Sequence, residues 1–193
     1  QWYASYAVGN REPVRNDFID APADRIPKHE TLRNVEAGWR FTLSRLNLNV
    51  NYYWMNYKNQ LVPTGELNDV GAIVRTNVDN SYRTGIELDG SIRISSKVFW
   101  NANFTLSQNR IKEFNEVMYD YGADFEEYNE VVTTYTNTDI AFSPNIIAGS
   151  GFFYMPLKGV EAGLLTKYVG RQFLDNTTNA SRSIDAYFIN DFR

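Results

Sequence analysis

Four stretches of the chain alternate between apolar and polar residues, one of them interrupted by Gly90, and this pattern constrains the fold more than any other feature. In one of them, Leu48, Val50 and Tyr52 alternate with Asn49 and Asn51. The four stretches are 35–43, 46–54, 82–94 and 98–107. A period of two is the signal of a β-strand with one apolar face, and about 9 to 11 residues of it match a tilted strand that crosses a bilayer.

Weaker alternation extends the strand prediction over most of the chain. Residues 145–154 and 160–173 alternate less cleanly, and 2–8 and 184–192 read as partial strands at the two ends. We therefore expect eight strands, six of them complete, in an all-β fold. Because both ends fall inside strand-like runs, we expect the chain to be cut from a longer protein.

The connections between the expected strands differ in length at the two ends. Tight turns are predicted at 44–45, 95–97 and 156–159, where Ser, Lys, Pro and Gly gather. Long polar segments at about 10–33, 62–81, 113–140 and 174–182 are expected to be loops at the opposite end. Short turns at one end and long loops at the other are typical of outer-membrane β-barrels, with the turns on the periplasmic side.

A soluble β-sandwich, such as a lectin-like jelly roll, would also alternate, so it is the main alternative fold. Three features favour a membrane-spanning antiparallel β-barrel. The strands are longer than the usual 5 to 6 or so residues. Their polar faces are rich in Asn, Thr and Ser but poor in Lys, which exposed soluble strands use against aggregation. Aromatic residues also lie near the strand ends, where interfacial girdles need them: Trp39, Trp54, Trp100, Tyr154 and Tyr168.

Composition and motifs exclude several classes of function. A net charge of -4 argues against nucleic-acid binding, and without cysteine there can be neither a disulfide nor a thiolate metal site. No apolar run is long enough for a transmembrane helix. No hydrolase, zinc or phosphate-binding motif is present, and the only histidine, His29, is expected to be solvated. We therefore expect no catalytic residue, metal or cofactor, although a barrel enzyme such as a lipase or protease is a third class to consider.

Several ordered stretches resemble the TonB-dependent receptors, particularly those of the Bacteroidetes type that are not specialised for glycans. They include Gly9–Pro13, Glu30–Gly38, Leu61–Asn77, Ser81–Glu87 and, further on, Phe142–Asn145, Tyr154–Pro156 and Tyr168–Asn176. The resemblance implies a barrel of about 22 strands with a plugged lumen. Residues 1–193 would be a partial barrel domain of about eight strands, with the plug domain and the last barrel strands absent.

The resemblance also implies a function and partners. Such a receptor lies in the bacterial outer membrane and imports a scarce nutrient. It is powered by the TonB–ExbB–ExbD system, which would be reached through the absent N-terminal region. A ferric siderophore or another iron complex is the expected ligand, with cobalamin, haem or an oligosaccharide as alternatives.

Ligand recognition is predicted in the long loops, chiefly 62–81 and 113–140, because loops on a rigid scaffold carry function. The second segment is the more aromatic and is rich in Asp and Glu, so it would favour neutral or cationic ligands. An ordinary solvated loop would have the same composition. The candidate ligand-binding residues are Tyr119, Tyr121, Phe125, Tyr128 and Arg75.

The period of two also assigns the faces of the strands. Leu48, Val50, Ile86, Leu88, Ala102 and Phe104 are expected to face lipid, and Asn49, Glu87, Asp89 and Asn103 the lumen. We expect the lumen-side charges to pair across strands, and some of them to meet the plug. These charges are Arg40, Glu87, Asp89, Arg93, Glu161, Lys167 and Arg171. Residues 176–178 match a glycosylation sequon but are expected to be only a polar loop.

Overall fold

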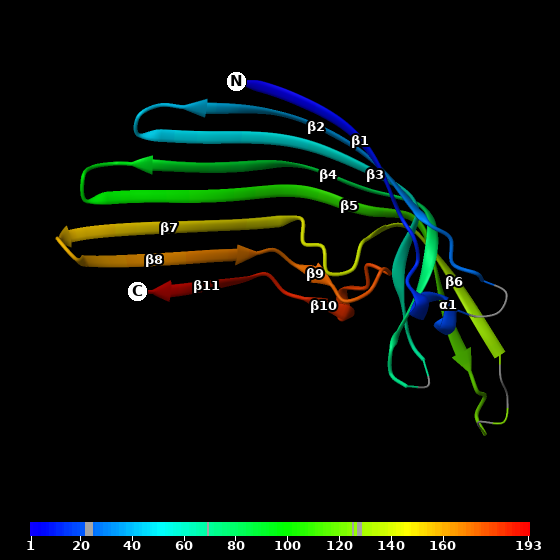
Figure 1. Cartoon of the computed structure of the whole chain (residues 1–193). Helices are drawn as coiled ribbons and strands as arrows, with labels where there is room; N and C mark the ends of the chain where they lie inside the picture. Colours follow the sequence, from blue (N-terminus) through cyan, green and yellow to red (C-terminus); the bar gives the residue numbers. More distant parts are fainter. Residues whose placement is uncertain (22–24, 69, 125, 127–128) are drawn as a thin grey trace.

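The computed structural model describes residues 1–21, 25–68, 70–124, 126 and 129–193. Its elements are long strands and a few short helical segments (Figure 1). The strands are β1 (Trp2–Arg11), β2 (Glu30–Thr42), β3 (Leu46–Leu67), β4 (Ile73–Arg93), β5 (Val98–Asp120), β6 (Asn129–Asp139), β7 (Ile146–Leu157), β8 (Val160–Val169), β9 (Gln172–Phe173), β10 (Ser183–Ile184) and β11 (Tyr187–Phe192). The helix α1 spans Arg15–Asp20 and the 3-10 turn η1 spans Ala180–Arg182.

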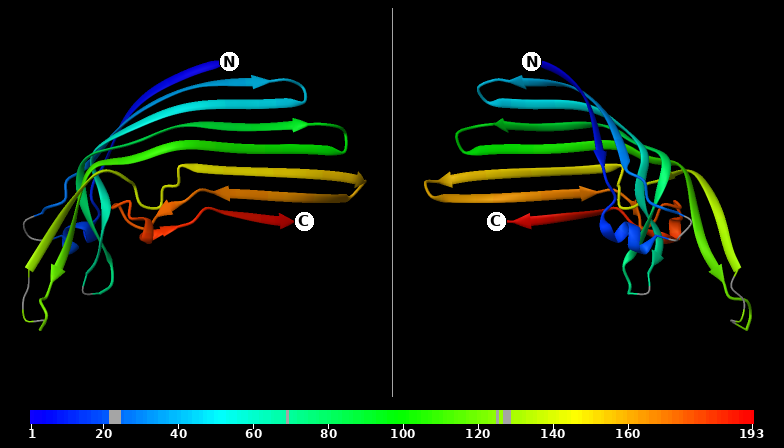
Figure 2. Two further views of the ribbon diagram at one scale, coloured as in Figure 1. Left: turned by 180° about the vertical axis from the view of Figure 1, so that it is seen from behind. Right: turned by 45° about the vertical axis from the view of Figure 1, so that its right-hand side comes forward.

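One curved antiparallel sheet makes up most of the molecule, as the two views of Figure 2 show. Its strand order is β1-β2-β3-β4-β5-β7-β8-β11, and β6 pairs with the far half of β5. The eight strands of this path confirm the expected strand number and the all-β class. Among the described residues, no helix is long and apolar enough to cross a membrane.

The tight turns lie at one end of the sheet, as predicted. Residues 43–45 join β2 to β3, 94–97 join β4 to β5, and 158–159 join β7 to β8. The last turn is narrower than expected, because β7 continues through Pro156 to Leu157. Gly159 has φ +83, a left-handed conformation that side chains with a Cβ rarely adopt.

The prediction that the long polar segments are loops is wrong for most of 62–81 and of 113–140. Residues 62–81 are largely the outer ends of β3 and β4, and 113–140 are largely β5 and β6. Segment 10–33 contains α1, and 174–182 contains η1. The alternation of apolar and polar residues is lost in these hairpins. The backbone hydrogen bonds of the paired strands continue without it.

The register confirms that apolar and polar residues occupy opposite faces of the sheet. Val50 lies opposite Leu88 and Leu88 opposite Phe104, while Asp89 lies between Asn49 and Asn103. The apolar face stays exposed: Leu88 and Phe104 each keep 38% of their accessible surface. A soluble sandwich would bury these residues between two sheets, so the sandwich alternative does not fit.

The polar face carries three cross-strand pairs of an aromatic ring and a glycine. Tyr3 pairs with Gly38, Tyr53 with Gly85 and Phe153 with Gly163. The Tyr3 ring covers the space that a Cβ at Gly38 would need, and its hydroxyl donates to Asn51 Oδ1 at 3.0 Å. These glycines therefore leave room for rings that lie flat across neighbouring strands.

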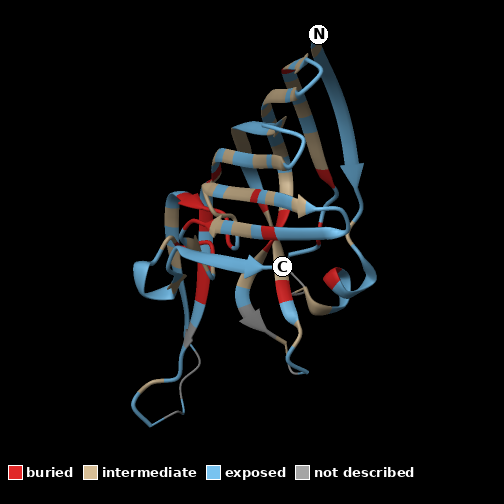
Figure 3. Ribbon diagram, turned by 90° about the vertical axis from the view of Figure 1, so that its left-hand side faces the viewer, coloured by how far each residue is buried: buried red, intermediate tan, exposed pale blue. Residues whose placement is uncertain are grey.

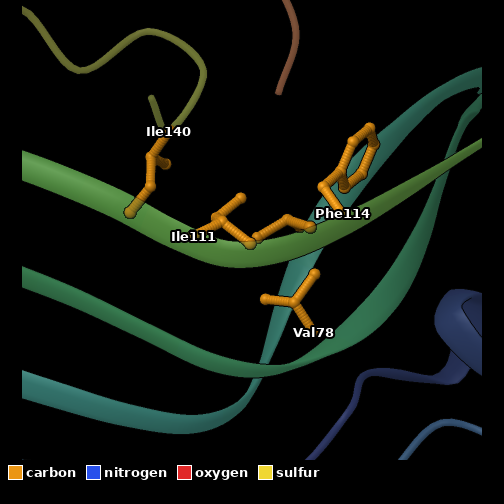
Figure 4. Close-up of a cluster of buried hydrophobic side chains, with 5 residues drawn as sticks. Val78, Ile111, Phe114 and Ile140 are labelled. Carbon is orange, nitrogen blue, oxygen red and sulfur yellow. The ribbon is translucent and has the colours of Figure 1, made fainter. Parts of the chain in front are cut away.

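The hydrophobic core lies at the end of the sheet opposite the tight turns, where β3 with β4 and β5 with β6 extend as two hairpins. We call this region the hairpin end. Buried residues concentrate in this region in Figure 3, and Figure 4 shows part of the central cluster. The cluster consists of Val62, Val78, Ile111, Phe114 and Ile140, and Tyr135 packs against it. These residues come from β3, β4, β5 and the segment after β6, so the core joins the two long hairpins.

Candidate functional site

The hairpin end forks because β4 and β5 separate. The two strands pair from Arg93↔Phe99 up to Ser81↔Ile111. Beyond that point β4 stays with β3, and β5 pairs with β6. We call the two prongs the β3–β4 hairpin and the β5–β6 hairpin. Figure 1 shows both extending from the sheet on the side opposite the tight turns.

Two asparagines in left-handed conformations lie where the hairpins leave the sheet. Asn59 and Asn137 both have φ 55 and are missing from the regular register. Asn tolerates this conformation better than most residues. The carbonyl of Asn59 accepts a hydrogen bond from Asn77, at 2.7 Å, and that of Asn137 from Arg110, at 2.9 Å. Side chains of the neighbouring strands therefore fix both irregularities.

A cavity of about 740 Å³ opens at the fork. Its lining comes from three segments that are distant in sequence: 25–28, 75–80 and 112–117, with Asn59 and Thr64. Asn77 ties the first segment to the second, because its side chain accepts from the Lys28 amide and donates to the Lys28 carbonyl. The volume lies within the range of small-molecule clefts, about 300 to 1,000 Å³.

The charges around the cavity favour anionic ligands over cationic ones, because basic residues outnumber acidic ones in its lining. The basic lining residues are Arg25, Lys28, Arg75 and Lys112, and the acidic ones are Asp79 and Glu113. Lys28 and Lys112 form no ion pair with any residue in the described parts of the chain. Two ammonium groups thus remain available to a ligand.

Among the predicted ligand residues whose side chains the structure describes, Arg75 lines the cavity and Tyr121 does not. Nε and Nη2 of Arg75 both contact Asp17 Oδ1, at 2.8 and 2.7 Å. Asp17 is buried in α1, where its other oxygen accepts from the Val14 amide at 2.8 Å. The pairing holds the guanidinium at the cavity wall and neutralises much of its charge.

Among the predicted aromatic candidates, Tyr121 is the one whose side chain the structure describes. Tyr121 is exposed and is not among the lining residues. Phe125 and Tyr128 lie outside the described residues, as does the side chain of Tyr119. His29 is exposed, as predicted.

Arginines from other segments pair with several acidic residues of 113–140. Glu116 accepts from Arg182 at 2.6 Å, Asp139 pairs with Arg110 at 3.1 Å, and Glu130 with Arg25 at 3.2 Å. The segment is therefore not the uniformly acidic surface on which the preference for neutral or cationic ligands was based.

A second cluster of polar groups lies beside the fork, around Arg182. Its Nη1 donates to Glu116 at 2.6 Å and to Asp175 at 2.8 Å, and these hydrogen bonds raise its pKa. Burial opposes ionisation of Asp175, but hydrogen bonds from Thr177 and Arg182 outweigh it and lower the pKa of this carboxyl. The Tyr135 hydroxyl donates to Glu116, which raises the pKa of Tyr135.

Little in the sequence predicted this cluster. Asn176, expected to be part of a polar loop, is completely buried. Asp17, Asn77, Glu116 and Arg182 were not predicted as site residues either. Their partners are distant in sequence, and the only signal was the Tyr168–Asn176 motif, which indicated a family and not a contact.

The polar face of the sheet holds the predicted lumen-side charges in ordered rows. One row runs Arg40↔Asn49↔Asp89↔Asn103↔Gly149↔Lys167. Glu87 lies one row away, where Asn51 donates to it at 3.3 Å, and Arg93 lies opposite Phe99. A shallow hollow of about 280 Å³ surrounds Gly149, Gly151 and Lys167.

The expected pairing of these charges across strands is wrong. In the described parts of the chain, Arg40, Glu87, Asp89, Arg93, Lys167 and Glu161 form no ion pair; Arg171 pairs with Asp185 at 3.2 Å. The row explains the result: Arg40 and Asp89 lie two strands apart, about 10 Å, and Asp89 and Lys167 lie farther apart still. Arg40 instead stacks over the Tyr3 ring, 4.7 Å from its centroid.

The fold matches solved outer-membrane receptor structures. A structure described as the copper transporter OprC superposes with a TM-score of 0.70 and 14% identity, covering 99% of this chain and 28% of that one. The siderophore receptor PiuA from Acinetobacter baumannii gives 0.66 and 19%, and the ferric yersiniabactin uptake receptor FyuA from Yersinia pestis gives 0.65 and 16%; each match covers 99% of this chain and 26% of the other. At these identities the likeness establishes the fold.

No curated protein sequence matches this chain. The model of the family described as "TonB dependent receptor-like, beta-barrel" matches this chain over residues 1–193, its entire length. That family consists of transporter receptors and not of enzymes. The chain spans about a quarter of the length of the solved structures that it matches. The family match and the curved antiparallel sheet agree, and the chain belongs to the TonB-dependent receptor β-barrel family.

Proposed function

We propose that this chain is the ligand-binding part of the barrel of an outer-membrane receptor that imports a small nutrient with energy from TonB. The observation that carries the proposal is the cavity at the fork, which lies at the end of the sheet opposite the tight turns. In outer-membrane barrels the short turns are periplasmic, so the fork and its cavity would face the outside of the cell.

The rest of the barrel would be supplied by other parts of a longer protein. In the described structure, β1 pairs only with β2, and β11 pairs only with β8. Open strand edges are unfavourable, and a spanning sheet must close because lipid offers no hydrogen bonds. We propose that residues 1–193 contribute eight strands to a larger plugged barrel. The unpaired charges Arg40, Glu87, Asp89, Arg93 and Lys167 would then meet water or the plug domain.

The exposed apolar face supports the location in a membrane. Ile86, Leu88, Phe104 and Leu106 form part of a continuous apolar surface, and each is at least 38% exposed. Such a surface would drive aggregation in water but is stable in contact with acyl chains.

For the ligand we propose an iron complex, with a ferric siderophore as the leading class. The excess of basic residues in the cavity suits the anionic groups of a chelate, and Lys28 and Lys112 would provide the charge contact. The Bacteroidetes type and the non-glycan class rest on the motif series alone.

Uptake by the complete receptor tests the proposal. Cells that rely on this receptor should grow on a ferric siderophore as their iron source, and growth should be lost when TonB is deleted. The double variant Lys28→Gln/Lys112→Gln should bind an anionic chelate about tenfold or more weakly, because two charge contacts are removed. Arg33→Gln/Lys58→Gln, at partly or fully exposed strand positions outside the cavity lining, is the matched control. Growth that is independent of TonB, or uptake of only cobalamin, haem or an oligosaccharide, would contradict the iron proposal.

A further inference from the structure

The segment between β8 and β11 folds back onto the fork and acts as a strap. We define the strap as residues 173–183. Near its centre, Asn176 has none of its surface accessible, although asparagine is usually exposed. A fully buried amide needs partners for its donor and its acceptor.

Both groups of the Asn176 amide have a partner, and the two partners belong to different prongs of the fork. Its Nδ2 donates to the carbonyl of Pro63, in β3, at 2.8 Å. Its Oδ1 accepts from the amide of Ala141, just after β6, at 2.9 Å. One side chain thus joins the β3–β4 hairpin to the base of the β5–β6 hairpin.

The rest of the strap is attached to the β5–β6 side only. The Phe173 carbonyl accepts from the Phe142 amide at 2.9 Å, and Thr178 Oγ1 accepts from the Asp139 amide at 2.7 Å. Arg182 reaches Glu116. Within the described residues, the bond from Asn176 to Pro63 is the one hydrogen bond from the strap to the β3–β4 hairpin.

Among the described residues, a further polar bridge crosses the fork, and it is of a weaker kind. Arg25, whose segment is held to β4 by Asn77, pairs with Glu130 of β6 at 3.2 Å, with both side chains more than a third exposed. Exposed ion pairs contribute little to stability because water and salt screen them. The buried Asn176 amide is not screened in this way.

We propose that Asn176 is a clamp that fixes the separation of the two hairpins and thereby the width of the cavity between them. It is a positioning residue, since it is not among the residues that line the cavity. The clamp itself holds for any ligand; its effect on uptake rests on the proposed function.

Substitution of Asn176 by aspartate should break one of its two hydrogen bonds and keep the other. Asn176→Asp keeps an oxygen for the Ala141 amide but loses the donor to Pro63, and it sets a carboxylate against that carbonyl. Asn179→Asp is the matched control, because Asn179 lies in the same strap. Its side chain only accepts, from the Ser181 amide and hydroxyl, which an aspartate also does.

The distance between the prongs can be measured in the complete receptor by electron spin resonance. Spin labels at Val70→Cys and Val132→Cys, both well exposed, report on one hairpin each, and this chain has no native cysteine. We expect a narrow distance distribution in the parent and in Asn179→Asp. Asn176→Asp should widen it about twofold, because opening of a segment that has lost a buried bond becomes populated. Heat-modifiable migration on a gel checks that each variant is an assembled barrel.

A second variant keeps the test decisive if Asn176→Asp does not assemble. Arg182→Gln replaces a 43% exposed side chain and removes its ion pairs with Glu116 and Asp175, so it should loosen the strap and produce a smaller widening. An unchanged distribution in every assembled variant would overturn the clamp. A clamp confirmed by distance in a receptor that imports no iron complex would leave the clamp standing and reject the proposed ligand.

Discussion

Phe104 and Phe114 lie on the same strand, β5, but in opposite surroundings. Phe104 keeps 38% of its surface accessible, whereas Phe114 keeps 1%. Phe104 belongs to the apolar face of the open sheet, and Phe114 to the cluster that joins the two hairpins. The single strand thus passes from a region where its apolar side chains stay exposed to a region where they are buried.

The two regions are stabilised in different ways. The hairpin end resembles a soluble domain, with a buried core, buried amides and paired acids. The sheet has backbone hydrogen bonds and aromatic–glycine pairs but little buried apolar surface of its own. Under the proposed function, the sheet would depend on lipid and on the remaining barrel, while the hairpin end has a core of its own.

The largest effect is expected from a cavity in the hairpin core. Phe114→Ala should destabilise the packed hairpin end by about 3 to 5 kcal/mol, the usual loss for a buried Phe, and should therefore raise the population of open hairpins. Hydrogen exchange of the β5–β6 amides in the complete receptor measures it. The β7–β8 amides serve as the internal control and should exchange as before. Equal loss of protection in both regions would mean that the hairpin end and the sheet do not open independently.

A charge introduced on the apolar face should lower stability nearly as much as the cavity in the core. Phe104→Arg should destabilise the receptor in vesicles by about 2 to 4 kcal/mol, the range for Arg near the bilayer centre. Its neighbour Asn103→Arg, on the polar face, should change stability far less. Urea unfolding in vesicles measures both. Similar costs for the two substitutions would show that the faces do not meet different solvents.

A smaller effect is expected where a ring lies over a glycine. Gly38→Ala should cost about 1 to 3 kcal/mol, because the new methyl collides with the Tyr3 ring. Gly9→Ala is the matched control, since Gly9 has open space at the same atom. The same unfolding assay compares them. A neutral Gly38→Ala would show that Tyr3 moves aside freely and contributes little to the sheet.

The smallest effect is expected from acid at the strap. Because the pKa of Asp175 is lowered in the folded state, its contribution to stability is present above the usual carboxyl pKa of about 3.9. That contribution is lost as the pH falls through the lowered value. The protection factors of the amides of 173–183, which correct the exchange rates for the intrinsic effect of pH, should therefore decrease once the pH is below about 4. Asp175→Asn should weaken this dependence, and an unchanged pH profile in that variant would exclude Asp175 as its source.

The sheet could be predicted from the sequence because alternation is a local property. Leu88 and Asp89 reveal their faces by sequence neighbours alone, and the tight turns follow from their composition. The hairpin end could not be predicted in this way. Its strands lose the alternation, and Asn176 is buried by Pro63, 113 residues away. The alignment of Arg40, Asn49 and Asp89 in one row could not be predicted either, because it depends on the register between strands, which the sequence does not specify.

Spin-label scanning along β5 of the complete receptor in lipid vesicles tests the central contrast most directly. Single labels from Val98 to Phe114 should show access to oxygen, which enriches in lipid, alternating with access to a polar nickel complex. We expect oxygen access to peak at Ala102 and Phe104 and to dip at Asn103, and the alternation to end near Ile111, where the core begins. Alternation that continued unchanged through Phe114, or low access to both reagents at Ala102 and Phe104, would contradict the account.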